Sequence, residues 1–161
     1  MSRSLLNWLA RYWSYMDDVS KIIDCEVKHI TTDSRDIKPH TVFIAQRGYQ
    51  QHGSHFVRHA IDNGAMAVLM DSKDRAELAK TWSQMPASVM AMHELHDFIE
   101  QIICDFYPQV DDIVKVGVTG TNGKTTVTQL VAQLASALQV KSAVIGTLGA
   151  GIMAEHGQLT K

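Results

Sequence analysis

Residues 114–126 read V-K-V-G-V-T-G-T-N-G-K-T-T, and this stretch decides the fold of the second part of the chain. An apolar, strand-like run ends in a glycine-rich turn, and an amphipathic segment follows. Gly120 and Gly123 permit a tight turn that brings backbone N–H groups close to phosphate oxygens. A helix that starts near Lys124 adds unpaired N–H groups and the positive end of its dipole. This order of strand, glycine loop and helix N-terminus predicts a phosphate-binding loop.

Two side chains supply the chemistry of the predicted loop. Lys124 can reach the β and γ phosphates of a nucleotide, and the Thr125 hydroxyl can ligate Mg²⁺. The spacing departs from the general G-x-x-x-x-G-K-[ST] pattern, because Val118 stands where that pattern has its first glycine. The alternative is a glycine-rich turn without a ligand, but such a turn does not require the lysine.

Composition excludes several classes of protein. The chain has 161 residues, 45% of them hydrophobic, and a net charge of −2. These values predict a soluble globular protein without the large positive surface that binding of nucleic acid requires. The sequence contains no apolar run of about 18 residues and no signal peptide, so neither membrane insertion nor secretion is expected. Cys25 and Cys104 are far apart, which favours free thiols in a reducing cytosol.

Hydrophobic periodicity predicts alternating strands and helices ahead of the phosphate loop. Pro108 and the aspartates that follow it mark the expected domain boundary. The predicted fold class is α/β: a small mixed-sheet α/β domain over residues 1–108, then the start of a P-loop, parallel-sheet domain over 109–161. The expected strands cover residues 27–30, 41–45, 65–70 and 88–92, and the expected helices cover 4–15, 54–62, 71–82 and 95–106.

The second domain is predicted to begin as strand, helix and strand, over residues 113–118, 125–138 and 142–145. This order predicts a parallel pair with a right-handed crossover. Residues 146–161 are not predicted to form a further helix or strand that would complete the domain. A P-loop domain needs more than two strands to build a sheet with both faces covered, so the chain is expected to end inside this domain. The helix is expected to turn four apolar side chains inward: Leu130, Val131, Leu134 and Leu138.

The G-T-N-G-K-T-T form of the loop resembles the ATP loop of the Mur ligase family, the ATP-dependent amide-forming ligases of peptidoglycan precursor synthesis. A second match lies upstream, where Thr32-Asp33-Ser34-Arg35 is followed by Val42-Phe43-Ile44-Ala45, Gly48 and Gly53. This order is similar to the first domain of the family. Within the family the similarity is greatest to MurE-type ligases, which add the third peptide residue to UDP-N-acetylmuramoyl-L-alanyl-D-glutamate, and Gly146-Thr147-Leu148-Gly149 also fits them.

The resemblance implies a cytoplasmic ligase with ATP and Mg²⁺ as cofactors, and a UDP-N-acetylmuramoyl-dipeptide and an amino acid as substrates. Lys124 is the expected catalytic clamp on the phosphates, and Thr125 is the expected Mg²⁺ ligand. The implied UDP-binding residues are Thr32, Ser34, Tyr49, Gln50 and Gln51. The implied ATP-binding residues are Gly120, Thr121, Asn122, Gly123, Lys124, Thr125 and Thr126.

Several alternatives stay open on the sequence. Residues 33–35 could form a simple solvated turn, and the family usually has Asp-Gly where this chain has His52-Gly53. A MurF-like ligase shares both motifs, and a stand-alone nucleotide-binding module without catalysis would carry the same loop. The added amino acid is expected to be meso-diaminopimelate, with lysine as the alternative, and the chain by itself is expected not to ligate.

The histidines do not predict a metal site. His93-Glu94-Leu95-His96 is one residue short of the H-E-x-x-H spacing that places two histidines on one helix face. His52, His55 and His59 lie three and four residues apart, but no cysteine or carboxylate cluster completes a ligand set.

Overall fold

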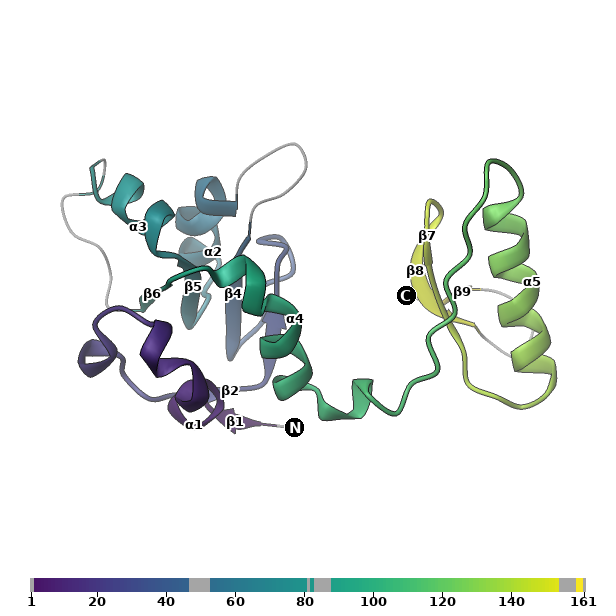
Figure 1. Cartoon of the computed structure of the whole chain (residues 1–161), viewed down its shortest axis with the longest axis horizontal. Helices are drawn as coiled ribbons and strands as arrows, with labels where there is room; N and C mark the ends of the chain where they lie inside the picture. The colour runs from purple at the N-terminus through teal and green to yellow at the C-terminus, as the bar shows by residue number, and fades with distance from the viewer. Residues whose placement is uncertain (1, 47–52, 81, 83–87, 154–158, 161) are drawn as a thin grey trace. The chain divides into compact units, whose positions relative to one another are not determined.

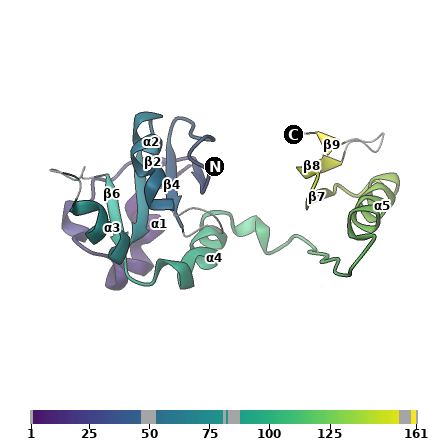
Figure 2. The ribbon, with the colours of Figure 1, turned by 90° about the horizontal axis from the view of Figure 1, so that it is seen from above.

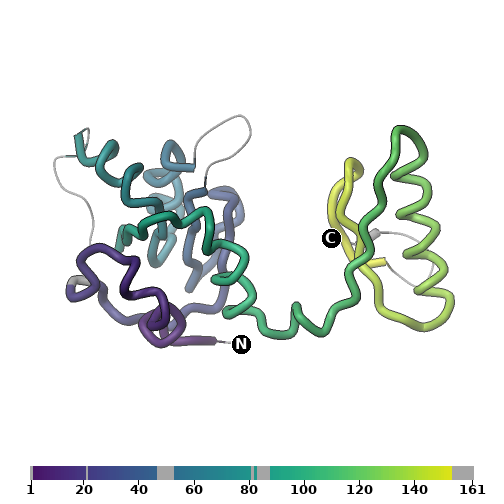
Figure 3. The backbone as a smooth tube through the Cα atoms, viewed as in Figure 1, coloured from purple at the N-terminus to yellow at the C-terminus, as the bar shows by residue number. Residues whose placement is uncertain are grey.

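The computed structural model describes residues 2–46, 53–80, 82, 88–153 and 159–160. The chain forms two compact units, Met1–Ile113 and Val114–Lys161, which are described separately (Figure 1). The tube in Figure 3 follows the chain from the first unit into the second. No helix in the described part of the chain combines the length and the apolar character that a membrane span requires.

A four-stranded sheet organises the first unit. The order is β3 (His29–Thr31), β4 (Thr41–Ala45), β5 (Ala67–Asp71) and β6 (Val89–Met92), and every neighbouring pair is parallel. The predicted α/β class is confirmed, but the predicted mixed sheet is not. The antiparallel pair β1 (Arg3–Ser4) and β2 (Glu26–Val27) forms a separate ladder, too short to extend the sheet.

Helices cover both faces of this sheet (Figure 2). Val42 and Ile44 of β4 face the layer that contains α1 (Leu5–Leu9) and α4 (Leu95–Phe106). Phe43 and Ala45 face the opposite layer, with α2 (Val57–Asp62) and α3 (Ser72–Ala79). Because both faces are buried, β4, β5 and β6 are nearly continuous apolar runs without polar alternation.

The predicted helices are found with small changes at their ends. The predicted helix over residues 4–15 divides into α1 and the 3-10 helix η1 (Ala10–Tyr15), and the helix over 54–62 begins as η3 (Gly53–Phe56). Helix α4 has the predicted bounds, and its buried residues include Leu95, Ile102 and Phe106. Short 3-10 turns η2 (Val19–Lys21) and η4 (Pro108–Val110) complete the unit.

The described residues of the second unit form one helix and one small antiparallel sheet. Helix α5 (Lys124–Ala137) is followed by β7 (Ala143–Gly146), β8 (Gly149–Met153) and β9 (Leu159–Thr160), paired in that order. The prediction of a strand over 113–118 in a parallel pair was wrong, because residues 114–119 belong to no strand. Strand β7 pairs instead with β8 across the two-residue turn at Thr147 and Leu148, with Gly149 at φ +111°. A tight hairpin brings adjacent segments together at low loop-closure cost.

The predicted inward face of α5 was also wrong. Ala132 is the buried residue of the helix, and it packs with Val144 and Met153. The Ser142 hydroxyl donates to the Ala132 carbonyl at 3.0 Å, which holds the hairpin against the small side chains of the helix. The four apolar residues expected to face inward are exposed: Leu130 at 58%, Val131 at 44%, Leu134 at 63% and Leu138 at 69%.

Candidate functional site

The turn that follows β3 is built by side chains bonded to its own backbone. Thr31 Oγ1 accepts from the Asp33 N–H at 3.0 Å, and Asp33 Oδ1 accepts from the Arg35 N–H at 3.0 Å. Such bonds fix tight turns without help from a sheet or helix. The turn leaves the carboxyl end of a parallel strand, which is the edge where open α/β sheets bind ligands.

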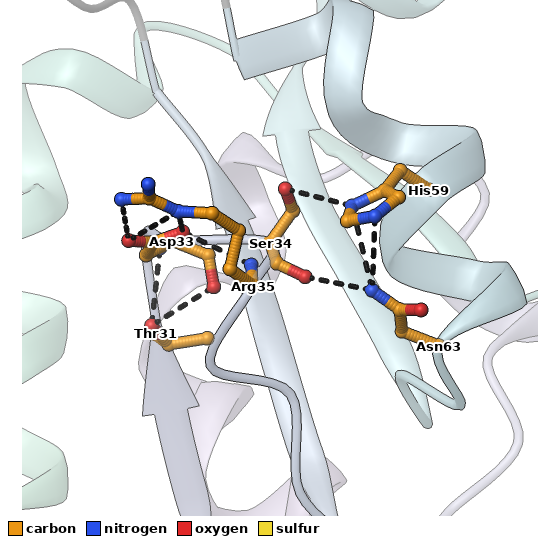
Figure 4. Close-up of polar contacts among 6 residues, drawn as sticks. All are labelled: Thr31, Asp33, Ser34, Arg35, His59 and Asn63. Carbon is orange, nitrogen blue, oxygen red and sulfur yellow. Dashed lines mark hydrogen bonds and ion pairs between the residues drawn. The ribbon is translucent and has the colours of Figure 1, made fainter.

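Asp33 and Arg35 form a two-point ion pair on this turn (Figure 4). Arg35 Nη2 lies 2.6 Å from Asp33 Oδ2, and Arg35 Nε lies 2.9 Å from Asp33 Oδ1. The side-chain hydrogen bond from Arg35 lowers the pKa of Asp33 to about 2, and the same contact raises the pKa of Arg35. The carboxylate therefore stays ionised and holds the guanidinium in one orientation.

Ser34 lies between these two residues and points into the protein. It is 6% exposed, and its Oγ lies 3.1 Å from His59 Nδ1. The Asn63 side-chain amide donates to the Ser34 carbonyl at 3.1 Å. His59 and Asn63 come from α2 and its C-terminal end, four residues apart, so they lie on one helix face as Figure 4 shows.

A cavity of about 750 Å³ opens over this turn. Of the predicted UDP-binding residues, Thr32 and Ser34 line it, while Tyr49, Gln50 and Gln51 lie outside the described residues. The residues that line it are Thr32, Asp33, Ser34, Arg35, Phe56 and His59. His59 was not among the site residues predicted from the sequence. The histidine lies 25 positions from Ser34, and no local pattern signals that pairing.

The glycine-rich loop in the second unit contains two glycines with positive φ. Gly120 has φ +147° and Gly123, which precedes α5, has φ +76°. Both values lie in the region that favours glycine. The Lys124 ammonium donates to the carbonyls of Gly120 and Thr121, so the lysine lies across its own loop.

A second cavity, of about 250 Å³, lies beside this loop. Lys124 and Thr125 line it, and the other predicted ATP-binding residues are not among its lining residues: Gly120, Thr121, Asn122, Gly123 and Thr126. Thr125 Oγ1 lies 3.2 Å from Thr147 Oγ1 in the β7–β8 turn. Thr147 was not among the predicted loop residues, because only the folded hairpin brings it to Thr125.

The residues at this loop fit a Mg²⁺–nucleotide. Mg²⁺ takes oxygen ligands together with phosphate oxygens, and the hydroxyls of Thr125 and Thr147 supply two neighbouring oxygens. The ammonium of Lys124 supplies the positive charge that a polyphosphate requires. A side chain at Gly123 would be strained by the positive φ, so glycine suits the turn that precedes α5.

Both units of the chain are similar in sequence to known proteins. Residues 26–107 match the model of the "Mur ligase family, catalytic domain", and residues 118–161 match that of the "Mur ligase middle domain". A UDP-N-acetylmuramoyl-L-alanyl-D-glutamate--2,6-diaminopimelate ligase from Haemophilus influenzae strain PittEE is 35% identical over 133 residues. The relative from strain PittGG is 35% identical over 130 residues. The two alignments cover 82% and 80% of this chain.

Solved structures show the same fold at lower identity. A UDP-N-acetylmuramoylalanyl-D-glutamyl-2,6-diaminopimelate--D-alanyl-D-alanyl ligase from Acinetobacter baumannii aligns with a TM-score of 0.57 at 19% identity, over 86% of this chain and 29% of that protein. A second structure, of MurF from the same organism, gives 0.55 at 20% identity, over 86% and 28%. The chain spans 27% of the length of the Haemophilus relatives. The matches of both family models, in order along the chain, show that it belongs to the Mur ligase family.

Proposed function

We propose that the chain is part of a MurE-type, ATP-dependent ligase of the cytoplasm that extends the peptide of a UDP-N-acetylmuramoyl precursor. The observation that carries this proposal is the presence of two built sites in one chain, the cavity at Thr32–Arg35 and the loop at Gly120–Thr126. The identity of 35% to ligases that use UDP-N-acetylmuramoyl-L-alanyl-D-glutamate favours this branch over a MurF-type enzyme. The MurF structures show only the fold, at 19% and 20% identity.

The proposed role of the first unit is to hold the uridine nucleotide of the substrate. Thr32 and Ser34 line the cavity, and the Arg35 guanidinium stands beside it in a fixed orientation. Tyr49, Gln50 and Gln51 are proposed to complete the binding surface. Hydroxyl and guanidinium groups suit carbonyl and phosphate oxygens.

The proposed role of the second unit is to hold ATP with Mg²⁺. Residues 120–126 form the proposed cradle, with Lys124 as the clamp on the β and γ phosphates and Thr125 as the Mg²⁺ ligand. Transfer of the γ-phosphoryl group to a substrate carboxylate oxygen yields an acyl phosphate and ADP. The amine of meso-diaminopimelate then attacks the carbonyl carbon, phosphate leaves with the bonding pair, and an amide forms. Lys124 contributes by neutralising charge during the first transfer.

Residue-resolved NMR of the chain tests both roles. UDP is expected to shift the backbone amides of residues 32–35, and MgATP is expected to shift those of residues 120–125 and 147. Addition of the dipeptide substrate, meso-diaminopimelate and MgATP to the chain by itself is expected to release no ADP. Shifts from UDP confined to the second unit, or no shifts with either nucleotide, would contradict the proposed roles.

The full-length ligase tests the choice of substrate. ADP release is measured with either UDP-N-acetylmuramoyl dipeptide or UDP-N-acetylmuramoyl tripeptide as the carboxylate substrate. Each is combined with meso-diaminopimelate, lysine or D-alanyl-D-alanine as the amine. Turnover with the dipeptide and meso-diaminopimelate is expected. Turnover only with the tripeptide and D-alanyl-D-alanine would identify a MurF-type enzyme instead.

A further inference from the structure

The first unit contains another cavity, which the proposed function does not use. It has a volume of about 230 Å³ and lies at the amino ends of two strands, where Ala67 begins β5 and Ser88 directly precedes β6. The turn at residues 32–35 follows the carboxyl end of β3 in the same parallel sheet. Because parallel strands run in the same direction, the two cavities lie at opposite edges of the sheet.

Hydrogen bonds hold both walls of this cavity in place. The Leu5 N–H at the start of α1 donates to the Cys25 carbonyl at 2.9 Å. The Asp24 carboxylate accepts from the Leu6 N–H at 3.0 Å, so the segment that carries Cys25 is fixed on α1 at two points. The facing wall belongs to β5 and β6, which pair with each other in the sheet. The cavity is therefore a property of the folded unit.

The lining of the cavity is apolar and uncharged. Cys25 and Ser88 are its polar members, and six apolar residues complete it: Leu5, Ile22, Ile23, Met66, Ala67 and Met90. Burial and the Asp24 carboxylate raise the pKa of the Cys25 thiol, so this group is neutral near pH 7. None of these lining residues, all of them described, has a buried side-chain polar atom without a hydrogen-bond partner. The cavity therefore presents neither a charge nor an unpaired buried polar group.

The size of the cavity and its sulfur atoms indicate the class of ligand. An apolar cavity of about 150 Å³ is large enough to bind benzene, and this cavity has about 230 Å³. Met66 and Met90 bring two thioethers to it, and Cys25 brings a thiol. Thioether sulfur makes favourable contacts with the edge of an aromatic ring, which a saturated ring of the same size does not offer. We propose that this cavity binds a small, uncharged molecule with one aromatic ring.

The cavity is open to solvent on one side. Ile23 is 75% exposed and Met66 is 37% exposed, and both line it. A ligand can therefore bury its ring while a polar substituent stays in water, as aromatic groups with one polar end do in proteins. The inference is independent of the proposed nucleotide site, which lies at the other edge of the sheet.

Phenol and cyclohexanol are the matched probes, because both have one hydroxyl on a six-membered ring and only phenol is aromatic. In methyl-resolved NMR of the chain, phenol is expected to shift the methyl groups of Met66, Ala67 and Met90, with a dissociation constant of about 1 mM. Cyclohexanol is expected to bind about two- to tenfold more weakly. The amides of residues 32–35 should not shift. Shifts of equal size at Met153 in the second unit, or shifts that do not saturate, would overturn the proposal.

A double variant tests the role of sulfur. Met66→Leu combined with Met90→Leu keeps the side-chain volume and removes both thioethers. Phenol is expected to bind it about two- to tenfold more weakly, while the affinity for cyclohexanol stays within about twofold. Met70→Leu is the matched control, because Met70 is buried in β5 but packs in the layer on the opposite face of the sheet. An unchanged ratio of the two affinities in the double variant would overturn the choice of an aromatic ligand.

Cys25→Phe tests the location of the site. Cys25 is only partly buried, and a phenyl group at this position is expected to occupy the cavity and to prevent binding of both probes. The amide spectrum of the second unit and of residues 32–35 serves as the check that the variant is folded. Unchanged affinity for phenol in the folded variant would overturn the location. The double methionine variant does not depend on this substitution, so it tests the proposal even if Cys25→Phe does not fold.

Discussion

Gly53 approaches the main chain of Gln46 so closely that a Cβ atom at position 53 would lie 2.4 Å from the Gln46 carbonyl oxygen. The Gly53 N–H donates to the same oxygen at 3.0 Å, so the end of β4 and the start of η3 are tied together at one point. Both residues flank the segment that carries Tyr49, Gln50 and Gln51.

Gly53→Ala is expected to lower the free energy of unfolding by about 1–3 kcal/mol, because the neighbour is backbone and cannot rotate away. Urea denaturation measures the change. Gly117→Ala is the control, since nothing lies within 4 Å of a Cβ at that position. Equal stability of Gly53→Ala and the unchanged chain would refute the close approach.

The Asp33–Arg35 pair predicts a loss of stability in acid. The folded-state pKa of Asp33 is about 2, below the ordinary value of 3.8. A lowered folded pKa contributes stability that is present above the unfolded value, and that is lost as pH falls through the folded value. We expect the loss between about pH 4 and 2, with a size of about 0.2–1 kcal/mol because both side chains are exposed.

Asp33→Asn provides the comparison for this titration. The variant has no carboxylate at this position, so its free energy of unfolding should fall less steeply between about pH 4 and 2. The measurement is urea denaturation at several pH values for both proteins. Identical slopes would show that the ion pair contributes nothing in solution.

Lys124→Ala is expected to weaken MgATP binding about 10- to 100-fold, because it removes charge-assisted hydrogen bonds to phosphate. Lys115→Ala removes the same charge from an exposed position nine residues earlier and should change affinity by less than about twofold. Calorimetric titration with MgATP compares the two. Equal losses in both variants would indicate a general charge effect without a loop-specific clamp.

Ile102→Ala is expected to destabilise the first unit by about 2–5 kcal/mol. Ile102 is completely buried, and its backbone carbonyl accepts a hydrogen bond from the indole N–H of Trp8 at 3.1 Å. This bond connects α1 to α4. Ile23→Ala, at a side chain that is 75% exposed, should stay within about 0.5 kcal/mol. Thermal unfolding of both variants provides the measurement, and similar midpoints would contradict the described core.

Local sequence patterns determined the elements whose residues are neighbours along the chain. The bounds of β4 and α4 follow from a continuous apolar run and from helical spacing, and both are found as predicted. The positive φ values of Gly120 and Gly123 follow from the glycine pattern of the loop itself. In each case the interaction that fixes the structure lies within a few residues, so the sequence alone contains it.

Tertiary structure decided the features that depend on distant partners. The pairing of Ser34 with His59 requires α2 to lie beside the turn that follows β3, and no spacing in the chain encodes it. The buried face of α5 is the one that meets the hairpin at Ala132, although its leucines have the stronger apolar pattern. A helix can show which of its faces is apolar, but only the element that packs against it decides which face is buried.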